Sequence, residues 1–147
     1  MATYTVQVSN TALSTSNDLL TLIPASNRLV RIVEVSVAGM GTASSANELG
    51  VYRSTGGTTG GGAITPGKIS STAPTAASTV NTTWTGQPTL GSKLFALGVN
   101  SNGGIYRWVA RPGEEPLFIG GTDQLSLRSA VGTGNVSVHV VFDEDAF

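Results

Sequence analysis

Two runs of alternating apolar and polar residues, within residues 116–142, constrain the fold of this chain more than any other feature. The apolar residues of each run share one face, and they are Leu125, Leu127 and Val131 in the first run and Val136, Val138, Val140 and Phe142 in the second. Residues 132–135, Gly-Thr-Gly-Asn, separate the runs and favour a turn. The pattern predicts a β-hairpin with one face in a core. Val138→Asp should therefore be far more damaging than Ser137→Asp.

Similar alternation recurs along the chain and predicts further short strands. They are expected near residues 3–9, 19–23, 28–38, 49–53, 63–69, 78–84, 93–99 and 105–110. Residues 100–104, Asn-Ser-Asn-Gly-Gly, should join the last two as a second hairpin. About eight to ten short strands without a substantial helix indicate an all-β fold. A terminal strand in the core and a long central crossing favour a jelly-roll-like antiparallel β-sandwich over an up-and-down barrel.

The strand over residues 28–38 has an irregular apolar pattern. Val30 and Ile32 share one face, whereas Val33, Val35 and Val37 share the other. Side chains alternate strictly along a regular strand, so the change predicts a β-bulge near Ile32–Val33 or burial on both faces.

Length and composition limit both architecture and function. The 147 residues indicate one domain, residues 1–147, with a Gly/Ser/Thr-rich excursion at residues 55–92. The chain holds 35 Ser and Thr residues, 19 Gly and no Cys, which favours strands and loops and excludes disulfides. Its net charge is −1, only 12% of its residues are charged, and its Lys and Arg are scattered. We therefore expect neither a nucleic-acid nor a membrane partner.

No pattern in the sequence predicts catalysis, a cofactor or a metal site. Residues 62–68 match the spacing GxxxxGK, but Ile69 replaces the required Ser or Thr and Pro74 opposes a following helix. His139 is the only histidine and alternates out of phase with Val138 and Val140, so it should lie outside the core. We expect a non-enzymatic protein, because a lone His lacks the partners that a general base or a metal ligand needs.

The candidate partner contacts are aromatic or acidic side chains. Tyr106 and Trp108 share one face of a predicted strand, and with Trp84 they could form a platform for a sugar, although core or subunit packing is the commoner role of such rings. Acidic residues occur in a loop bracketed by prolines and in a tail near the end of the sequence. They are Glu114, Glu115, Asp143, Glu144 and Asp145.

The segment YRWVARPGEEPLFIGGTDQLSLRSAVGTGNVSVHVVFDE carries a resemblance in layout. It has an aromatic strand, a Pro-Gly-Glu loop, a short strand ending in Gly-Gly-Thr-Asp, and Val-rich strands with an acidic end. Together with the Gly/Ser/Thr-rich middle, it resembles the small β-sandwich decoration, or cement, proteins of tailed-bacteriophage heads.

The resemblance implies a virion structural protein on the capsid exterior. Such a protein binds the outer surface of the major capsid protein lattice as a homotrimer and stabilises it. Assembly in the host cytoplasm is expected, since MATYTVQVSN has neither the basic flank nor the apolar core of a signal peptide. The alternative is a glycan- or receptor-binding module of a phage fibre or a lectin-like protein.

Overall fold

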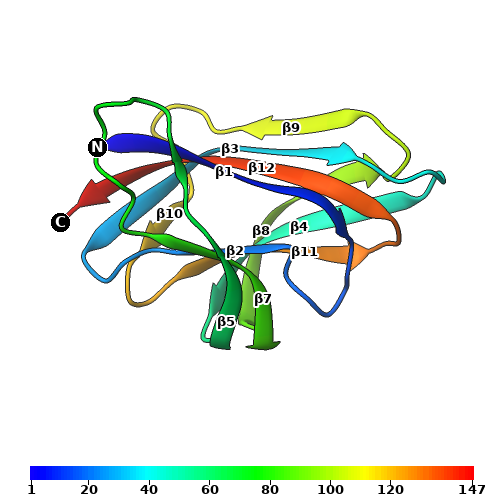
Figure 1. The fold of residues 1–147 in the computed structure, drawn as a ribbon, viewed down its shortest axis with the longest axis horizontal. Coiled ribbons are helices and arrows are strands. Elements are labelled where there is room, and N and C mark those ends of the chain that lie inside the picture. The colour runs from blue at the N-terminus through cyan, green and yellow to red at the C-terminus, as the bar shows by residue number, and fades with distance from the viewer.

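The computed structural model describes the backbone of residues 1–147 and the side chains of all of them except residues 58 and 59. Twelve strands form two six-stranded antiparallel sheets that pack face to face (Figure 1). Sheet A contains β1 (Ala2–Ala12), β3 (Arg28–Gly39), β6 (Gly67–Lys68), β9 (Ile105–Val109), β10 (Leu117–Ile119) and β12 (Asn135–Ala146). Sheet B contains β2 (Leu20–Ile23), β4 (Ala46–Thr55), β5 (Thr58–Ile64), β7 (Thr79–Gly86), β8 (Thr89–Asn100) and β11 (Gln124–Val131).

The strand order confirms the predicted all-β sandwich. Sheet A runs β10-β3-β12-β1-β6, with β9 pairing a second part of β3, and sheet B runs β5-β7-β2-β11-β4-β8. Successive strands repeatedly alternate between the sheets, as in a jelly roll. None of the described residues is helical, so no described segment forms a helix able to cross a membrane.

The core lies between the sheets and is dominated by aliphatic side chains. β12 contributes Val136, Val138, Val140 and Phe142, each at most 1% exposed, as predicted. The ring of Phe142 stacks on that of Tyr4 from β1, with centroids 5.6 Å apart. Burying each such side chain contributes about 1.5–3 kcal/mol, so β12 anchors sheet A.

The predicted bulge in β3 is present. Val141 pairs with Glu34 but its neighbour Phe142 pairs with Ile32, so Val33 is the extra residue. The bulge puts Ile32 and Val35 on the same, buried face, although their spacing is odd. Burial on both faces, the other interpretation of the pattern, is therefore not needed.

Both predicted hairpins are wrong. β11 pairs with β2 and β4 in sheet B, whereas β12 pairs with β1 and β3 in sheet A, so residues 132–134 cross from one sheet to the other. β8 and β9 likewise lie in different sheets. Alternation reports which face of a strand is buried, but it does not report which strand lies beside it. Val131, expected in the core, follows a register shift in β11 and is 60% exposed.

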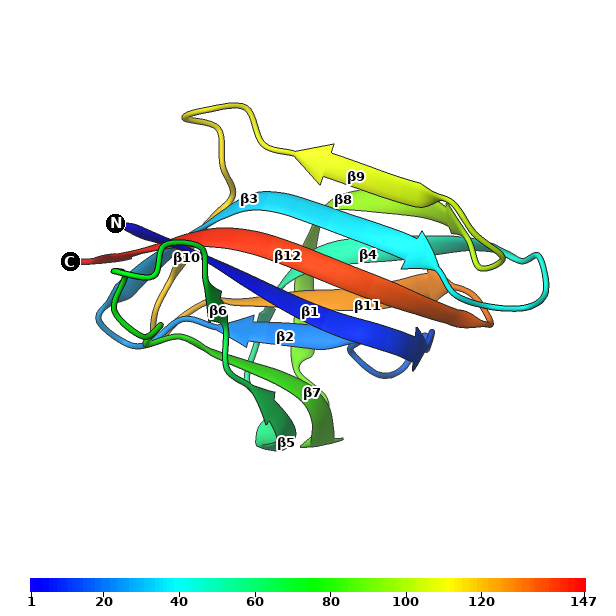
Figure 2. The same ribbon diagram turned by 45° about the horizontal axis from the view of Figure 1, so that its top comes forward.

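The excursion at residues 55–92 contains three whole strands, β5, β6 and β7, and the first residues of β8. β5 and β7 pair and project from the edge of sheet B, and β6 joins the edge of sheet A (Figure 2). Two side chains hold its loop: the Tyr4 hydroxyl donates to the Pro74 carbonyl at 3.0 Å, and the Glu144 carboxylate accepts from the amides of Ala77 and Ser78. Burial and the nearby Glu144 charge raise the pKa of Tyr4.

Candidate interaction surface

Four of the predicted contact residues lie at one side of the sandwich. Tyr106 and Trp108 are on β9, and Glu114 and Glu115 are in the loop that follows it. Figure 2 shows this loop and β9 along the rim of sheet A. Trp84 and the acidic end of β12 lie elsewhere, so the structure assembles only part of the predicted set.

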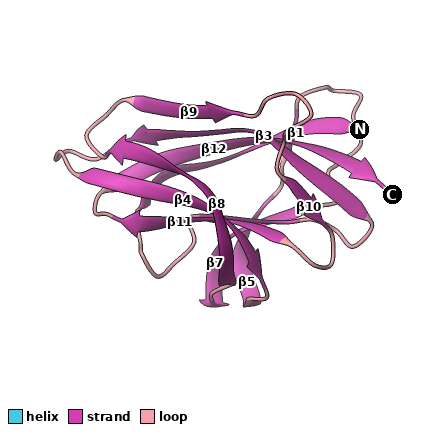
Figure 3. Cartoon of the chain, turned by 180° about the vertical axis from the view of Figure 1, so that it is seen from behind, coloured by secondary structure: helices cyan, strands magenta, loops and turns pink.

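This side of the sandwich exposes a strand edge of each sheet. In the described structure, β9 pairs only with β3, and β8 pairs only with β4. Figure 3 shows β8 and β9 from behind, on the same side of the molecule. An unpaired strand edge offers backbone N–H and C=O groups to another chain. We call β9, the outer edge of β8 and residues 110–116 the open rim.

The open rim is apolar along β9. Ile105 is 77% exposed, Val109 is 49% exposed and Tyr106 is 39% exposed. Trp108 points the other way from Ile105 and Val109 and packs half-buried against the core. The sequence does not show which face of β9 lies toward the core. In the structure the face that carries Trp108 lies toward the core, and the outward face carries the β-branched residues Ile105 and Val109.

One ion pair fixes the charge on the outward face of β9. Arg107 donates to Glu34 of β3 at 2.7 Å. This hydrogen bond is the largest cause of the lowered pKa of Glu34, which burial opposes and the Arg107 and His139 charges reinforce. The pair neutralises the middle of the strand, which leaves its ends apolar.

The loop after β9 is preorganised by its own carboxylate. Both oxygens of Glu115 accept from the amide of Gly113 at 3.0 Å, and Glu114 N donates to the Arg111 carbonyl at 2.9 Å. Hydrogen bonds from the backbone of Glu115 itself and of Gly113 lower the pKa of Glu115. The neighbouring Glu114 side chain is exposed and available to a partner.

Trp84 belongs to a buried polar network on the outer face of sheet B. Its indole N–H donates to the Thr21 hydroxyl at 3.0 Å, and that hydroxyl donates to Asp18 at 2.6 Å. Asp18 also forms an ion pair with Arg128 at 2.6 Å and accepts from Ser126. A buried carboxylate needs such partners, so this network holds residues 84–88 against the sheet.

The predicted acidic tail is not a tail, because β12 continues to Ala146. Glu144 is only 7% exposed, and besides its two amide partners it lies 3.5 Å from Arg28 Nε. Asp143 accepts from the Thr3 hydroxyl at 2.6 Å, and Asp145 lies 3.4 Å from the N-terminal amine. These carboxylates hold the chain together, and Asp145, whose side chain is 42% exposed, is also accessible to a partner.

His139 lies on the outer face of sheet A, as predicted. Its Nε2 hydrogen-bonds to the Thr5 hydroxyl, across the β1–β12 pair. Lys68, at the end of the GxxxxGK match, is exposed in β6 and precedes no helix in the described chain. No three His, Cys, Asp or Glu side chains in the described part are placed to share a metal ion.

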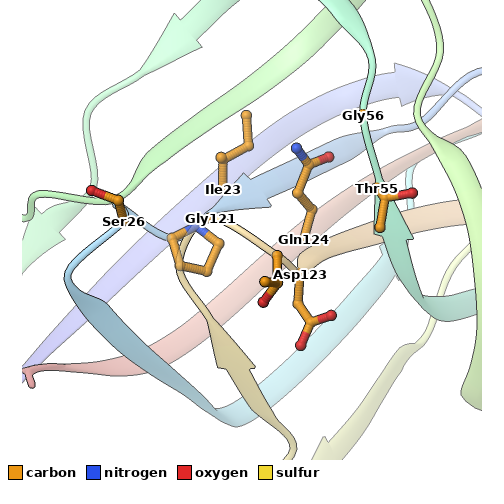
Figure 4. A pocket seen from close by; sticks show the side chains of 9 residues that line it. Ile23, Ser26, Thr55, Gly56, Gly121, Asp123 and Gln124 are labelled. Atoms are coloured by element: carbon orange, nitrogen blue, oxygen red, sulfur yellow. The ribbon is translucent and has the colours of Figure 1, made fainter.

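Two cavities lie at opposite ends of the sandwich. One cavity, of about 310 Å³, lies between the end of β2 and the start of β11. The side chains of Ile23 and Gln124 line it from these two strands (Figure 4). Its carboxylate, Asp123, is already engaged with Arg53 at 3.0 Å. The second cavity, of about 480 Å³, is formed by loops at the far end.

Comparison with known proteins adds no relative. No family model matches the chain, no curated protein matches its sequence, and no solved structure matches its fold. The fold defines the chain as an antiparallel β-sandwich protein, and its function rests on the geometry described above.

Proposed function

We propose that this chain is a non-enzymatic virion structural protein. It would decorate a tailed-phage capsid from outside, as a homotrimer bound to the major capsid protein lattice, and stabilise that lattice. The observation that carries the proposal is the open rim, where two sheet edges and the apolar residues Ile105 and Val109 are exposed together.

The tendency of unpaired strand edges to pair with other strands supports a role in assembly for the open rim. Soluble β proteins usually protect an edge with charges, prolines, bulges or a covering loop, because a free edge recruits other strands. The sequence Ile-Tyr-Arg-Trp-Val of β9 has high β-propensity, and its one charge is neutralised by Glu34. An edge of this kind is suited to a permanent contact with another chain.

A three-fold assembly places a further demand on the surface. A closed ring of three uses two different patches on each subunit, so β9 of one copy would meet a different surface of the next. The loop at residues 110–116 leaves the rim beside this contact, and its exposed Glu114 provides a charged contact for the capsid lattice.

The glycan- or receptor-binding alternative depends on Trp84, Tyr106 and Trp108 and is less well supported. β7, which carries Trp84, is separated from the β8 edge by three strands of sheet B. The indole N–H of Trp84 is used by Thr21, and Trp108 stacks on Phe95. The three rings therefore do not form one platform.

An add-back experiment tests the proposed function. Purified protein is mixed with phage capsids that lack a decoration protein, and the capsids are sedimented. We expect wild-type protein to co-sediment and to raise the temperature at which the capsids release DNA. Glu114→Lys should weaken binding, whereas Lys68→Glu, on the opposite edge of sheet A, should not. Wild-type protein that stays in the supernatant with every capsid tested would contradict the proposal.

A further inference from the structure

The residues that line the larger cavity, of about 480 Å³, belong to segments at the end of the sandwich away from the chain termini. Figure 1 shows these segments at the right and the two termini at the left. Its walls come from the connection between β3 and β4, the end of β1, the start of β12, and the connections after β8 and β11. Its volume is within the range of about 300–1,000 Å³ that small-molecule sites occupy.

The lining of this cavity is uncharged and combines polar with apolar residues. No ionisable side chain lines it, and the hydrogen-bonding side chains are amides and hydroxyls. The chief ones are Asn10, Thr42, Ser44, Ser45, Thr133 and Asn135. A charged ligand would lose hydration here without gaining a counter-charge. Amides and hydroxyls both donate and accept, so they suit a neutral ligand that does the same.

Asn10 and Asn135 form the best-defined polar element of the wall. Asn135 Nδ2 donates to Asn10 Oδ1 at 3.0 Å. This leaves Asn10 Nδ2 as a donor and Asn135 Oδ1 as an acceptor, and neither atom has a hydrogen-bond partner among the described residues. One free donor beside one free acceptor matches a pair of adjacent hydroxyl groups.

The backbone is distorted where it presents Asn10. The β1–β12 register shifts between Val8 and Thr11, and Asn10 has a φ of 47°, the only positive value among the non-glycine residues described. Bulges and left-handed residues of this kind re-aim side chains and occur preferentially at functional sites. Asn10 also keeps its amide N–H bonded to the Ser137 hydroxyl, so the distortion is supported by the fold.

We propose that this cavity binds a neutral saccharide. One sugar hydroxyl would donate to Asn135 Oδ1, and its neighbour would accept from Asn10 Nδ2. The side chain of Met40, 52% exposed at the cavity wall, would pack against the C–H face of the sugar ring. None of the candidate glycan contacts predicted from the sequence, Trp84, Tyr106 and Trp108, lines this cavity, and the site does not depend on the capsid proposal.

Three variants test whether this cavity is a binding site. Asn10→Gly removes the amide, and glycine adopts the left-handed backbone without strain, so the fold is kept. Asn135→Ala removes the acceptor. Ala43→Trp fills the cavity from an exposed position. Ser26→Ala, at the smaller cavity, is the matched control.

Binding is measured on an array of neutral and acidic glycans and then by NMR titration with the best neutral one. We expect a neutral glycan to bind, each of the two Asn variants to weaken it at least about tenfold, or about 1.4 kcal/mol, and Ala43→Trp to abolish it. Ser26→Ala should bind as wild type, and thermal unfolding confirms that every variant is folded. The proposal is overturned if no neutral glycan binds at glycan concentrations up to about 10 mM, which is high enough to detect weak binding. It is also overturned if only acidic glycans bind, or if binding survives in the Asn10→Gly and Ala43→Trp variants. Binding lost in Trp84→Ala or Tyr106→Ala instead would also overturn it.

Discussion

The indole of Trp108 on β9 stacks on the ring of Phe95 on β8, with centroids 4.1 Å apart and planes 25° from parallel. The contact joins the edge strands of the two sheets where no backbone hydrogen bond connects them. Paired aromatic rings add stability beyond their buried area. The pair therefore closes the sandwich beneath the open rim and fixes the position of β9.

Trp108→Ala should remove the ring contact that joins the edge strands of the two sheets. We expect the free energy of unfolding, measured by denaturant titration, to fall by about 2–4 kcal/mol, near the lower end for aromatic truncation because Trp108 is only half-buried. Tyr106→Ala, on the same strand but more exposed, should cost less than about 1 kcal/mol. Equal losses in the two variants would contradict the deeper burial of Trp108 relative to Tyr106.

Val138→Asp tests the register of β12. Val138 is 1% exposed in the core, so an aspartate there would be buried without a partner and should cost more than about 4 kcal/mol. Ser137→Asp, one residue earlier on the outer face, should change stability by less than about 1 kcal/mol. Thermal unfolding of both proteins gives the comparison, and a mild effect of Val138→Asp would mean that the register is wrong.

The Glu34–Arg107 pair should make stability depend on pH in the acid range. The lowered pKa of Glu34 means that its stabilising contribution is full above the ordinary glutamate value, about 4.3, and is lost as pH falls through the folded-state pKa. Arg107→Gln should therefore reduce stability slightly at pH 7. The variant should also lose less stability than the wild-type protein when the pH is lowered. Unfolding curves at pH 7 and at about pH 3 measure this difference. An unchanged pH dependence in the variant would show that the pair does not set the pKa of Glu34.

Glu144→Ala should release the loop that precedes β7. The carboxylate accepts from the amides of Ala77 and Ser78 and pairs with Arg28, so its removal should cost about 2–3 kcal/mol. Hydrogen exchange at Ala77 and Ser78 should accelerate at least about tenfold, since protection follows local opening. Asp145→Ala is the control, and equal acceleration in it would argue against this anchor.

The sequence predicts strands and buried faces well in this protein. The bulge in β3, the buried residues of β12 and the outward position of His139 all follow from local alternation. The partners of β11 and β12 do not, because a connection rich in glycine can reverse within a sheet or cross to the other one. The burial of Glu144 was also not predictable, because it depends on a loop that is 66 residues away in sequence.

The candidate site is predictable only in part, for the same reason. Tyr106 lies on β9 and Glu114 lies in the loop that directly follows this strand, so their place on one side of the sandwich follows from the local sequence. The exposed edge beside them depends on which strands pair with β8 and β9, and local sequence does not specify that. The larger cavity likewise collects residues from five separate segments, and among its lining residues Asn10 and Gly134 have a positive φ.

The native mass in solution tests the role of the open rim most directly. Light scattering of wild-type protein should give three times the 15.0 kDa chain mass. The double variant Ile105→Lys and Val109→Lys, which places charges on the edge strand, should give a folded monomer, whereas Val131→Lys, at an equally exposed site away from the rim, should remain a trimer. A wild-type protein that is monomeric at every concentration, or a β9 double variant that still forms trimers, would contradict the account.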